Sequence, residues 1–461
     1  MKLFDTRTAT RQEFTPSGEE VTMYVCGPNL YGPCHVGHAL SFVVFDVLRR
    51  YLEYRGYRVR HVQNFTDIED RIINEANRQG RTIGDLAEHY IQRFHQEMGE
   101  LNVQRAHHYP RATENIDHMV EIIQKLIDKG HAYAVDGDVY FRVHSSPNYG
   151  ELSKRSLEDM QAGARIEIDP RKEDPMDFTL WKSSSEGEPS WPTPWGAGRP
   201  GWHIECTAMS LGLLGDQLDI HGGGQDVVFP HHENEIAQSE GYTGKSPFVR
   251  FWVHNGFLLA TESEEEKMTR HLGNFVSCRD ALANHHPDAI RLFLLSAHYR
   301  SPRAYSEEEL VAQERAAERM RLALDPVPAA PESGLPVEEY RQRFDEAMDN
   351  DLNTPRALAT LFDLAREINR QREAGVGVAG AQALLKELGG VLGLTFAASG
   401  SHDMVAAGPF IELLVNVRSQ LREANQYAVA DDIRTKLTQM GVAVEDGPDG
   451  ATWRFRQPDG S

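Results

Sequence analysis

Two histidines stand three residues apart around a glycine in CHVGH, residues 34–38. The segment follows an apolar run, so we expect it at a strand–loop–helix junction. The first turn of a helix presents free backbone N–H groups and a positive dipole, which favour phosphate. His35 and His38 could stabilise charge on a reacting triphosphate, and Gly37 would let the nucleotide approach closely. Two solvated or capping histidines fit the same pattern. Because the chain has no P-loop, this junction is the leading candidate for a nucleotide site.

A possible metal site begins in PHHENEIAQ, residues 230–238. On a helix, His231 and Glu235 share a face, which suits two ligands of one metal ion. Cys26, at the end of an expected strand, and Cys206 could add thiolates and complete a tetrahedral set. The spacing alone leaves inert packing thiols and a solvated His/Glu pair as alternatives.

A third segment, EEEKMTRHLGN at 264–274, is charged and contains a glycine. Lys267 and Arg270 could close over pyrophosphate as a mobile lid. An exposed loop without a function fits the same residues.

The elements that would position these groups follow from hydrophobic patterning. VTMYVCG (21–27) is typical of a buried strand, the segment from His38 to Gly56 of an amphipathic helix, and YRVRHVQNF (57–65) of a second strand. Strand, helix and strand in this order open a parallel α/β sheet. LDIHGGGQD (218–226) predicts a further strand that runs into a triple-glycine loop.

Composition shifts divide the rest of the chain. Residues 110–200 combine short strands with a Pro/Trp/Gly-rich segment and read as an insertion into the α/β core. DPVPAAPESGLP (325–336) is a linker by composition. Beyond it, Thr354 followed by Pro355 predicts the cap and first turn of a helix in a helical bundle. A second Gly/Ala/Ser-rich break spans 396–409.

Length and charge restrict the class of protein. The 461 residues allow two to four domains, and the net charge of −21 argues against a general nucleic-acid binder, although a local basic strip would suffice for a transient one. The N-terminal residues lack the apolar core of a secretory signal, and no apolar run is long enough to span a bilayer. Four widely spaced cysteines indicate a reducing, cytoplasmic setting.

Taken together, the motifs resemble class I aminoacyl-tRNA synthetases, and specifically the cysteinyl-tRNA synthetase family. CHVGH looks like the HIGH motif, and KMTRH (267–271) occupies the place of KMSKS, with Arg270 bringing a planar fork where a lysine is usual. The other matching segments follow in the family's order over essentially the whole chain: MYVCGPNLYGPCHVGH, NFTDIED, GWHIEC, HGGGQD, FPHHENEIAQS, DNDLNTPRAL and DGPDGATWR.

The resemblance implies a Rossmann-like parallel-sheet catalytic domain, a helical bundle and a small anticodon-binding domain. The expected bounds are 1–323 for the catalytic domain, with the insertion at about 110–200 and a stem-contact region at about 265–323. The bundle is expected at 324–395 and the anticodon-binding domain at 396–461.

The resemblance also implies a role for each motif residue. Zinc is expected on Cys26, Cys206, His231 and Glu235. The catalytic groups would be His35, His38, Lys267 and Arg270. Substrate or ATP would be bound by Gly27, Gly37, Thr66, Trp202, Asp226 and Arg270. The anticodon would be contacted by Tyr427, Asp431 and Asp446. The structural alternatives are a core position for Trp202, a helix cap for Asp226 and a buried tyrosine at 427.

The implied activity is the ATP-dependent joining of cysteine to tRNA(Cys) by a cytoplasmic monomer. The cysteine carboxylate attacks the α-phosphorus of ATP, bound with Mg²⁺, and the terminal ribose of tRNA then attacks the adenylate. Zinc prefers a thiolate to an alcohol, so it would select cysteine over serine. Two alternatives remain: a ligase that joins cysteine to an amino sugar, as in mycothiol synthesis, and a weakly catalytic paralogue that binds tRNA.

Overall fold

The computed structural model describes residues 1–157, 160, 169–185, 187–260, 275–326, 335–398, 402–424, 426–439, 442–447 and 450–455. The chain forms two compact units, Met1–Phe396 and Ala397–Ser461. Among the described residues, no helix is long and apolar enough to cross a membrane.

A four-stranded parallel sheet lies at the centre of the first unit, which confirms the predicted fold class. Its strand order is β10-β9-β3-β4, and every neighbouring pair is parallel. The strands are β3 (Glu20–Val25), β4 (Arg58–Gln63), β9 (Leu218–Gly224) and β10 (Val249–Asn255). Their near-continuous burial is expected of strands that are covered on both faces.

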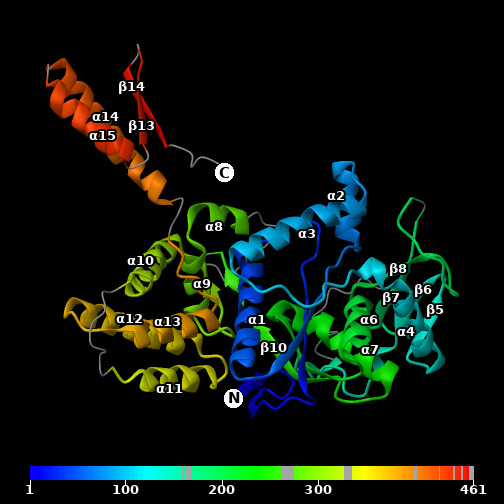
Figure 1. The fold of residues 1–461 in the computed structure, drawn as a ribbon. Helices are drawn as coiled ribbons and strands as arrows, with labels where there is room; N and C mark the ends of the chain where they lie inside the picture. Colours follow the sequence, from blue (N-terminus) through cyan, green and yellow to red (C-terminus); the bar gives the residue numbers. More distant parts are fainter. Residues whose placement is uncertain are drawn as a thin grey trace. The chain divides into compact units, whose positions relative to one another are not determined.

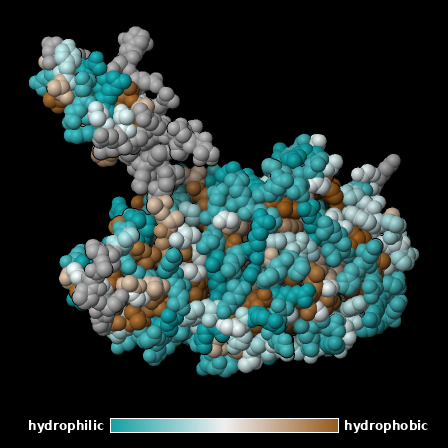
Figure 2. Space-filling model, viewed as in Figure 1, coloured by the Kyte–Doolittle hydropathy of each residue, from teal (hydrophilic) through white to brown (hydrophobic). Residues whose placement is uncertain are grey.

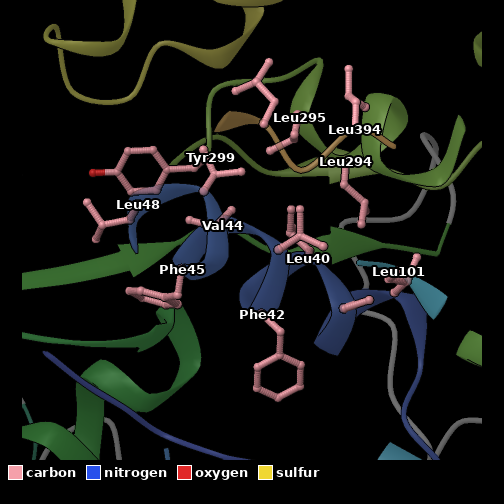
Figure 3. Close-up of a cluster of buried hydrophobic side chains, with 14 of the residues drawn as sticks. Leu40, Phe42, Val44, Phe45, Leu48, Leu101, Leu294, Leu295, Tyr299 and Leu394 are labelled. Atoms are coloured by element: carbon pink, nitrogen blue, oxygen red, sulfur yellow. The ribbon is translucent and has the colours of Figure 1, made fainter. Parts of the chain in front are cut away.

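Helix α1 (Val36–Tyr54) follows the CHVGH segment and connects β3 to β4. Figure 3 shows Leu40, Val44 and Leu48 on the side of α1 that faces Leu294 and Leu295, with Phe42 and Phe45 on the opposite side. Because the helix is covered on two sides, it is apolar around most of its circumference. It ends at Tyr54, and the chain turns away at Gly56, which has a φ of 86°.

The predicted loop at the three glycines is wrong, because Gly222, Gly223 and Gly224 belong to β9 and pair with β10. The reason is packing against α1: a Cβ on Gly222 would lie 2.3 Å from the Phe45 ring. Glycine at this position lets α1 approach the sheet closely, so its role here is a steric one.

An antiparallel sheet is inserted after β4 and packs through its helices on one side of the catalytic sheet (Figure 1). Helices α2 (Asp70–Gln79) and α3 (Ile83–Glu100) come first. The inserted elements are then α4 (Ile116–Asp128), β5 (Ala132–Val135), β6 (Asp138–Phe141), β7 (Phe178–Ser183) and β8 (Gly198–Pro200). Helices α6 (Trp202–Leu214) and α7 (Glu233–Thr243) flank β9 along the chain.

Helix α1 covers the other side of the catalytic sheet, and further helices lie beyond α1 (Figure 1). They are α8 (Cys278–Asn284), α9 (Pro287–Leu295), α10 (Glu307–Ala323), α11 (Val337–Met348), α12 (Thr354–Glu373) and α13 (Ala379–Val391). The predicted cap at Thr354 is wrong by one position. Asn353 caps α12 by accepting from the Arg356 N–H, whereas the Thr354 hydroxyl donates to the Leu295 carbonyl at 2.7 Å and ties α12 to α9.

A buried ionic group joins α1 to these helices. The Asp46 carboxylate accepts from Arg291 of α9 at 2.6 Å, and both side chains are fully buried. Arg50 donates to the same carboxylate at 2.9 Å. Arg291 also donates to the carbonyls of Leu392, just after α13, and Leu101, just after α3. One guanidinium therefore joins these two segments to Asp46 of α1.

The second unit contains α14 (His402–Glu423), α15 (Tyr427–Gln439) and the hairpin β13 (Val442–Gly447)–β14 (Gly450–Phe455). Its small core includes Ile411, Val415, Leu437, Val442 and Val444. Large apolar side chains are also exposed on α14, among them Phe410, 70% exposed, and Leu413, 60% exposed. By contrast, the visible face of the first unit is mainly hydrophilic (Figure 2).

Candidate active site

A cavity of about 270 Å³ opens where the carboxyl ends of the four parallel strands meet the start of α1. Ligands of open α/β sheets bind at this edge of the sheet. The cavity brings together ten of the predicted site residues: Cys26, Gly27, His35, Gly37, His38, Thr66, Trp202, Cys206, Asp226 and His231. Glu235, fully buried, lies beside this set on α7.

The two histidines of CHVGH cap α1 reciprocally. The His35 ring accepts from the His38 N–H at 3.2 Å through Nδ1, and the His38 ring accepts from the His35 N–H at 3.3 Å. The rings stack with centroids 3.6 Å apart. Because each Nδ1 accepts a hydrogen bond, a neutral ring carries its proton on Nε2. Each neutral ring therefore carries an Nε2–H donor, at a helix N-terminus that itself favours anions.

Gly27 lies where β3 and β4 end beside each other. A Cβ on this residue would lie 1.6 Å from the Asn64 carbonyl oxygen, and its N–H donates to the Asn64 Oδ1 at 2.9 Å. Only glycine fits here, so the backbone at this edge of the cavity is held at a fixed position.

The predicted metal ligands converge although they come from three separate segments. The sulfurs of Cys26 and Cys206 are 3.8 Å apart, close to the ~3.8 Å separation that two thiolates about 2.3 Å from one tetrahedral zinc would have. Nε2 of His231 lies 3.1 Å from Oε1 of Glu235, which in turn lies 4.0 Å from the Cys26 sulfur. The donor set, two thiols, an imidazole and a carboxylate, suits zinc.

Within the described residues, the donor atoms that lie within 4.8 Å of one another include His232 and leave out Cys206. Cys26, His231, His232 and Glu235 can place one donor atom each within 4.8 Å of one another. However, Nε2 of His232 is 3.2 Å from the Cys26 sulfur, and its Nδ1 is 2.8 Å from Nε2 of His254. This geometry lets His232 donate to a Cys26 thiolate while it accepts from His254.

Burial disfavours the charged forms of the side chains in the metal-ligand group. It raises the pKa of the Glu235 carboxyl and, together with the adjacent Cys206, the pKa of the Cys26 thiol. Burial also lowers the pKa of His231 well below its usual value, with a further contribution from His203. A bound dication would reverse the direction for the thiols and the carboxyl, since it stabilises their ionised forms.

A further layer of side chains orients the group. His221 lies 2.9 Å from Oε2 of Glu235, and Nδ1 of His203 lies 3.0 Å from Nδ1 of His231. The Trp202 ring stacks on His231 at 4.3 Å. Such partners fix the tautomer and direction of metal-binding side chains. His203 and His221 were not predicted as site residues, although they lie within the segments GWHIEC and HGGGQD.

The remaining polar residues of HHENE have a structural role. The Glu233 carboxylate accepts from the N–H groups of Gly150 and Ser153 at 2.9 and 2.8 Å, and Asn234 accepts from the Tyr149 hydroxyl at 2.5 Å. The start of α7, with the turn before it, therefore contributes Glu235 and His231 to the metal-ligand group, while Glu233 and Asn234 hold the loop at 149–153.

Five further predicted site residues belong to other parts of the chain. Lys267 and Arg270 lie outside the described residues. Tyr427, 53% exposed, begins α15, Asp431 is exposed on the same helix, and Asp446 belongs to β13. The buried position considered for Tyr427 is therefore wrong.

Comparison with protein families matches nearly the whole chain. Residues 13–315 match the family described as tRNA synthetases class I (C) catalytic domain. Residues 343–397 match the DALR domain, and residues 411–454 match the cysteinyl-tRNA ligase anticodon binding domain.

Individual relatives are similar from end to end. The cysteine–tRNA ligase of Dehalococcoides mccartyi strain BAV1 is 52% identical over 99% of this chain and 100% of its own length. That of Pseudomonas aeruginosa is 48% identical over 99% of both. Among solved structures, a Mycobacterium tuberculosis methionyl-tRNA synthetase in complex with methionyl-adenylate has a TM-score of 0.58 at 16% identity, covering 81% of this chain and 89% of that one. The similarity to the methionyl-tRNA synthetase structure is a similarity of fold.

Proposed function

We propose that this chain, which belongs to the cysteine–tRNA ligase family of class I tRNA synthetases, activates cysteine with ATP and transfers it to the terminal ribose of tRNA(Cys). The observation that carries the proposal is one cavity that joins the histidine start of α1 to the Cys26, Cys206, His231 and Glu235 group. Cysteine-dependent exchange of pyrophosphate into ATP, followed by charging of tRNA(Cys), tests it.

The first step places new charge at the start of α1. As the cysteine carboxylate attacks the α-phosphorus of Mg²⁺-bound ATP, negative charge shifts toward the departing pyrophosphate. The Nε2–H groups of His35 and His38, at the positive end of the α1 dipole, are the donors that would meet it. Gly27 and Thr66 bound the adjoining side of the cavity, where the amino acid would lie.

Selection of cysteine is assigned to zinc held by Cys26, Cys206, His231 and Glu235. A bound zinc ion supplies a soft Lewis acid that binds a thiolate far better than an alcohol. The chain's own residues keep the ligands in position: His203 orients His231, His221 orients Glu235, and His232 donates to Cys26.

The second unit is assigned to the anticodon. Tyr427 presents an exposed ring on which a splayed base could stack, and Asp431 lies one helical turn further along α15. Residues 324–395, between the catalytic part at 1–323 and this unit, are assigned to the helical bundle. An amino-sugar ligase is disfavoured, because the match at 411–454 is to an anticodon-binding domain.

Cys206→Ala is expected to lose zinc. Removing one of two thiolate ligands should weaken the site by more than the roughly 10–100-fold that the loss of an outer hydrogen bond costs. Elemental analysis of the purified variant after dialysis against a chelator measures the metal content directly. Cys278→Ala, which removes a buried thiol outside the metal-ligand group, should keep its zinc. Equal zinc content in both variants would contradict the assignment.

Arg270→Ala is expected to slow adenylate formation with little change in cysteine affinity. If Arg270 holds the pyrophosphate, the loss should be about 2–4 kcal/mol of transition-state stabilisation, the scale of one preorganised donor. Pre-steady-state measurement of adenylate formation gives the rate. Arg270→Lys should stay active, and Arg279→Ala, an exposed arginine of α8, serves as the control. A wild-type rate in Arg270→Ala would show that Lys267 carries the lid charge.

A further inference from the structure

A second, larger cavity adjoins the active-site cavity. It measures about 710 Å³ and lies between the start of α2, the start of α6 and the inserted sheet. The two cavities share the side chains of Arg71 and Trp202. A polymer whose end reacts in the inner cavity and whose next units occupy the outer one would pass these two side chains.

We propose that Arg71 binds a phosphate of the 3′-terminal nucleotides of the tRNA and so places the terminal ribose at the adenylate. The inference rests on the proposed function, because only the transfer step requires an RNA end in the inner cavity. A terminal ribose that enters this cavity brings the phosphates behind it toward its mouth. A positive, planar donor at this point fits that requirement.

The outer cavity as a whole is not a basic groove. Among the described residues, its lining contains five lysines and arginines and five carboxylates, so these charges balance. Lys182 and Arg199 both pair with Asp70, at 2.9 and 2.5 Å, and Arg171 pairs with Asp138 at 2.8 Å. Because these three cations already pair with carboxylates of the protein, the other two described cations of the lining, Arg71 and Lys172, are the candidates for binding a phosphate.

Arg71 is the better placed of those two cations. Lys172 lies over the Tyr140 ring at 5.6 Å, away from the inner cavity. Arg71 lines both cavities, and its guanidinium lies over the Tyr31 ring at 5.6 Å, with Nη1 3.4 Å from the Tyr31 hydroxyl. Within the described part of the chain, no carboxylate forms an ion pair with Arg71. Stacking on tyrosine restrains the guanidinium while leaving donors of its planar fork for a phosphate.

Arg71→Gln tests the proposal through the two half-reactions. Cysteine-dependent pyrophosphate exchange, which uses no tRNA, should stay within about twofold of the wild type. The kcat/KM of aminoacylation for tRNA(Cys) should fall about 10–100-fold, as expected for the loss of a charged hydrogen bond. The slope of log affinity against log salt should become shallower by about 0.7, the value for one single-stranded phosphate. Arg71→Lys should recover most of the activity.

A matched control lies on the same helix. Arg78 is exposed and pairs with Glu75 at 2.6 Å, so Arg78→Gln makes the same chemical change away from both cavities and should behave as the wild type. A tRNA(Cys) that lacks its 3′-terminal trinucleotide should bind the wild type and Arg71→Gln equally well.

The outcomes separate the two proposals. No cysteine-dependent exchange in the wild-type enzyme would refute the proposed function itself. Normal exchange in the wild type with an equal loss of exchange and transfer in Arg71→Gln would overturn the inference, since Arg71 would then serve ATP or cysteine. Weaker binding of the truncated tRNA by Arg71→Gln would also overturn it, because the contact would lie elsewhere on the RNA.

Discussion

Serine is expected to support ATP–pyrophosphate exchange roughly 10⁴–10⁵-fold less efficiently than cysteine, a difference in kcat/KM of about 5.5–7 kcal/mol. The two amino acids differ by one atom, so a cavity that judged only size would separate them poorly. The expected discrimination comes from the metal-ligand group, where a substrate thiolate would join the thiolates of Cys26 and Cys206, 3.8 Å apart. A serine hydroxyl entering the same position would be a poor ligand for a soft ion.

The matched control is 2-aminobutyrate, which has a methyl group where cysteine has its thiol. An apolar pocket would reject this analogue by only about 10–200-fold. A site built for a thiolate should reject it as strongly as serine. The measurement is kcat/KM for exchange with each of the three amino acids, with serine and 2-aminobutyrate freed of traces of cysteine. Serine activity within about a hundredfold of cysteine activity would contradict thiol-specific selection.

The parallel-sheet fold could be predicted from the sequence because its signals are local. The apolar run at 21–27 and the helix ending at Gly56 match β3 and α1 closely. The errors arose where tertiary packing, and not the local sequence, determines the conformation. The glycines of HGGGQD look like a loop by composition, yet Gly222 lies in a strand because the Phe45 ring occupies the space of its side chain. Thr354 is a residue type that often caps helices, but its hydroxyl donates a hydrogen bond to the carbonyl of Leu295 in another helix.

The candidate site was less accessible to sequence patterns. His231 and Glu235 are four residues apart, so their shared face follows from helical geometry. Cys26 and Cys206 are 180 positions apart, and only the family resemblance grouped them with that pair. Spacing could not reveal His254, which reaches the group from β10 through His232. The position of Arg71 between two cavities depends on how the inserted sheet packs, which no local pattern encodes.

The sequence also could not reveal the buried ion pair that joins α1 to the helices beside it. Charged residues in an amphipathic helix usually face solvent, so the sequence offers no sign that Asp46 is fully buried. In the structure, Asp46 accepts from Arg291 at 2.6 Å and from Arg50 at 2.9 Å. Burial lowers the pKa of Arg291, and the Asp46 carboxylate beside it opposes this shift.

Asp46→Ala is therefore expected to destabilise the first unit by about 3–5 kcal/mol, because it leaves a buried charge without its counterion. Thermal and urea unfolding of the full chain measure the loss, with zinc content measured alongside to detect damage at the metal-ligand group. Asp363→Ala is the matched control: Asp363 pairs with Arg343 at 2.6 Å but is 38% exposed, so its loss should cost under about 1 kcal/mol.

The double variant Asp46→Leu with Arg291→Met distinguishes a missing counterion from a missing contact. Replacing both charges by apolar side chains of similar size should recover much of the stability, since burying an ion pair costs nearly as much as its attraction returns. If Asp46→Ala is as mild as Asp363→Ala, the carbonyls of Leu392 and Leu101 suffice for the guanidinium. If instead the double variant is as unstable as Asp46→Ala, then α1 and α9 depend on the specific hydrogen bonds of this pair and not on the removal of an unpaired charge.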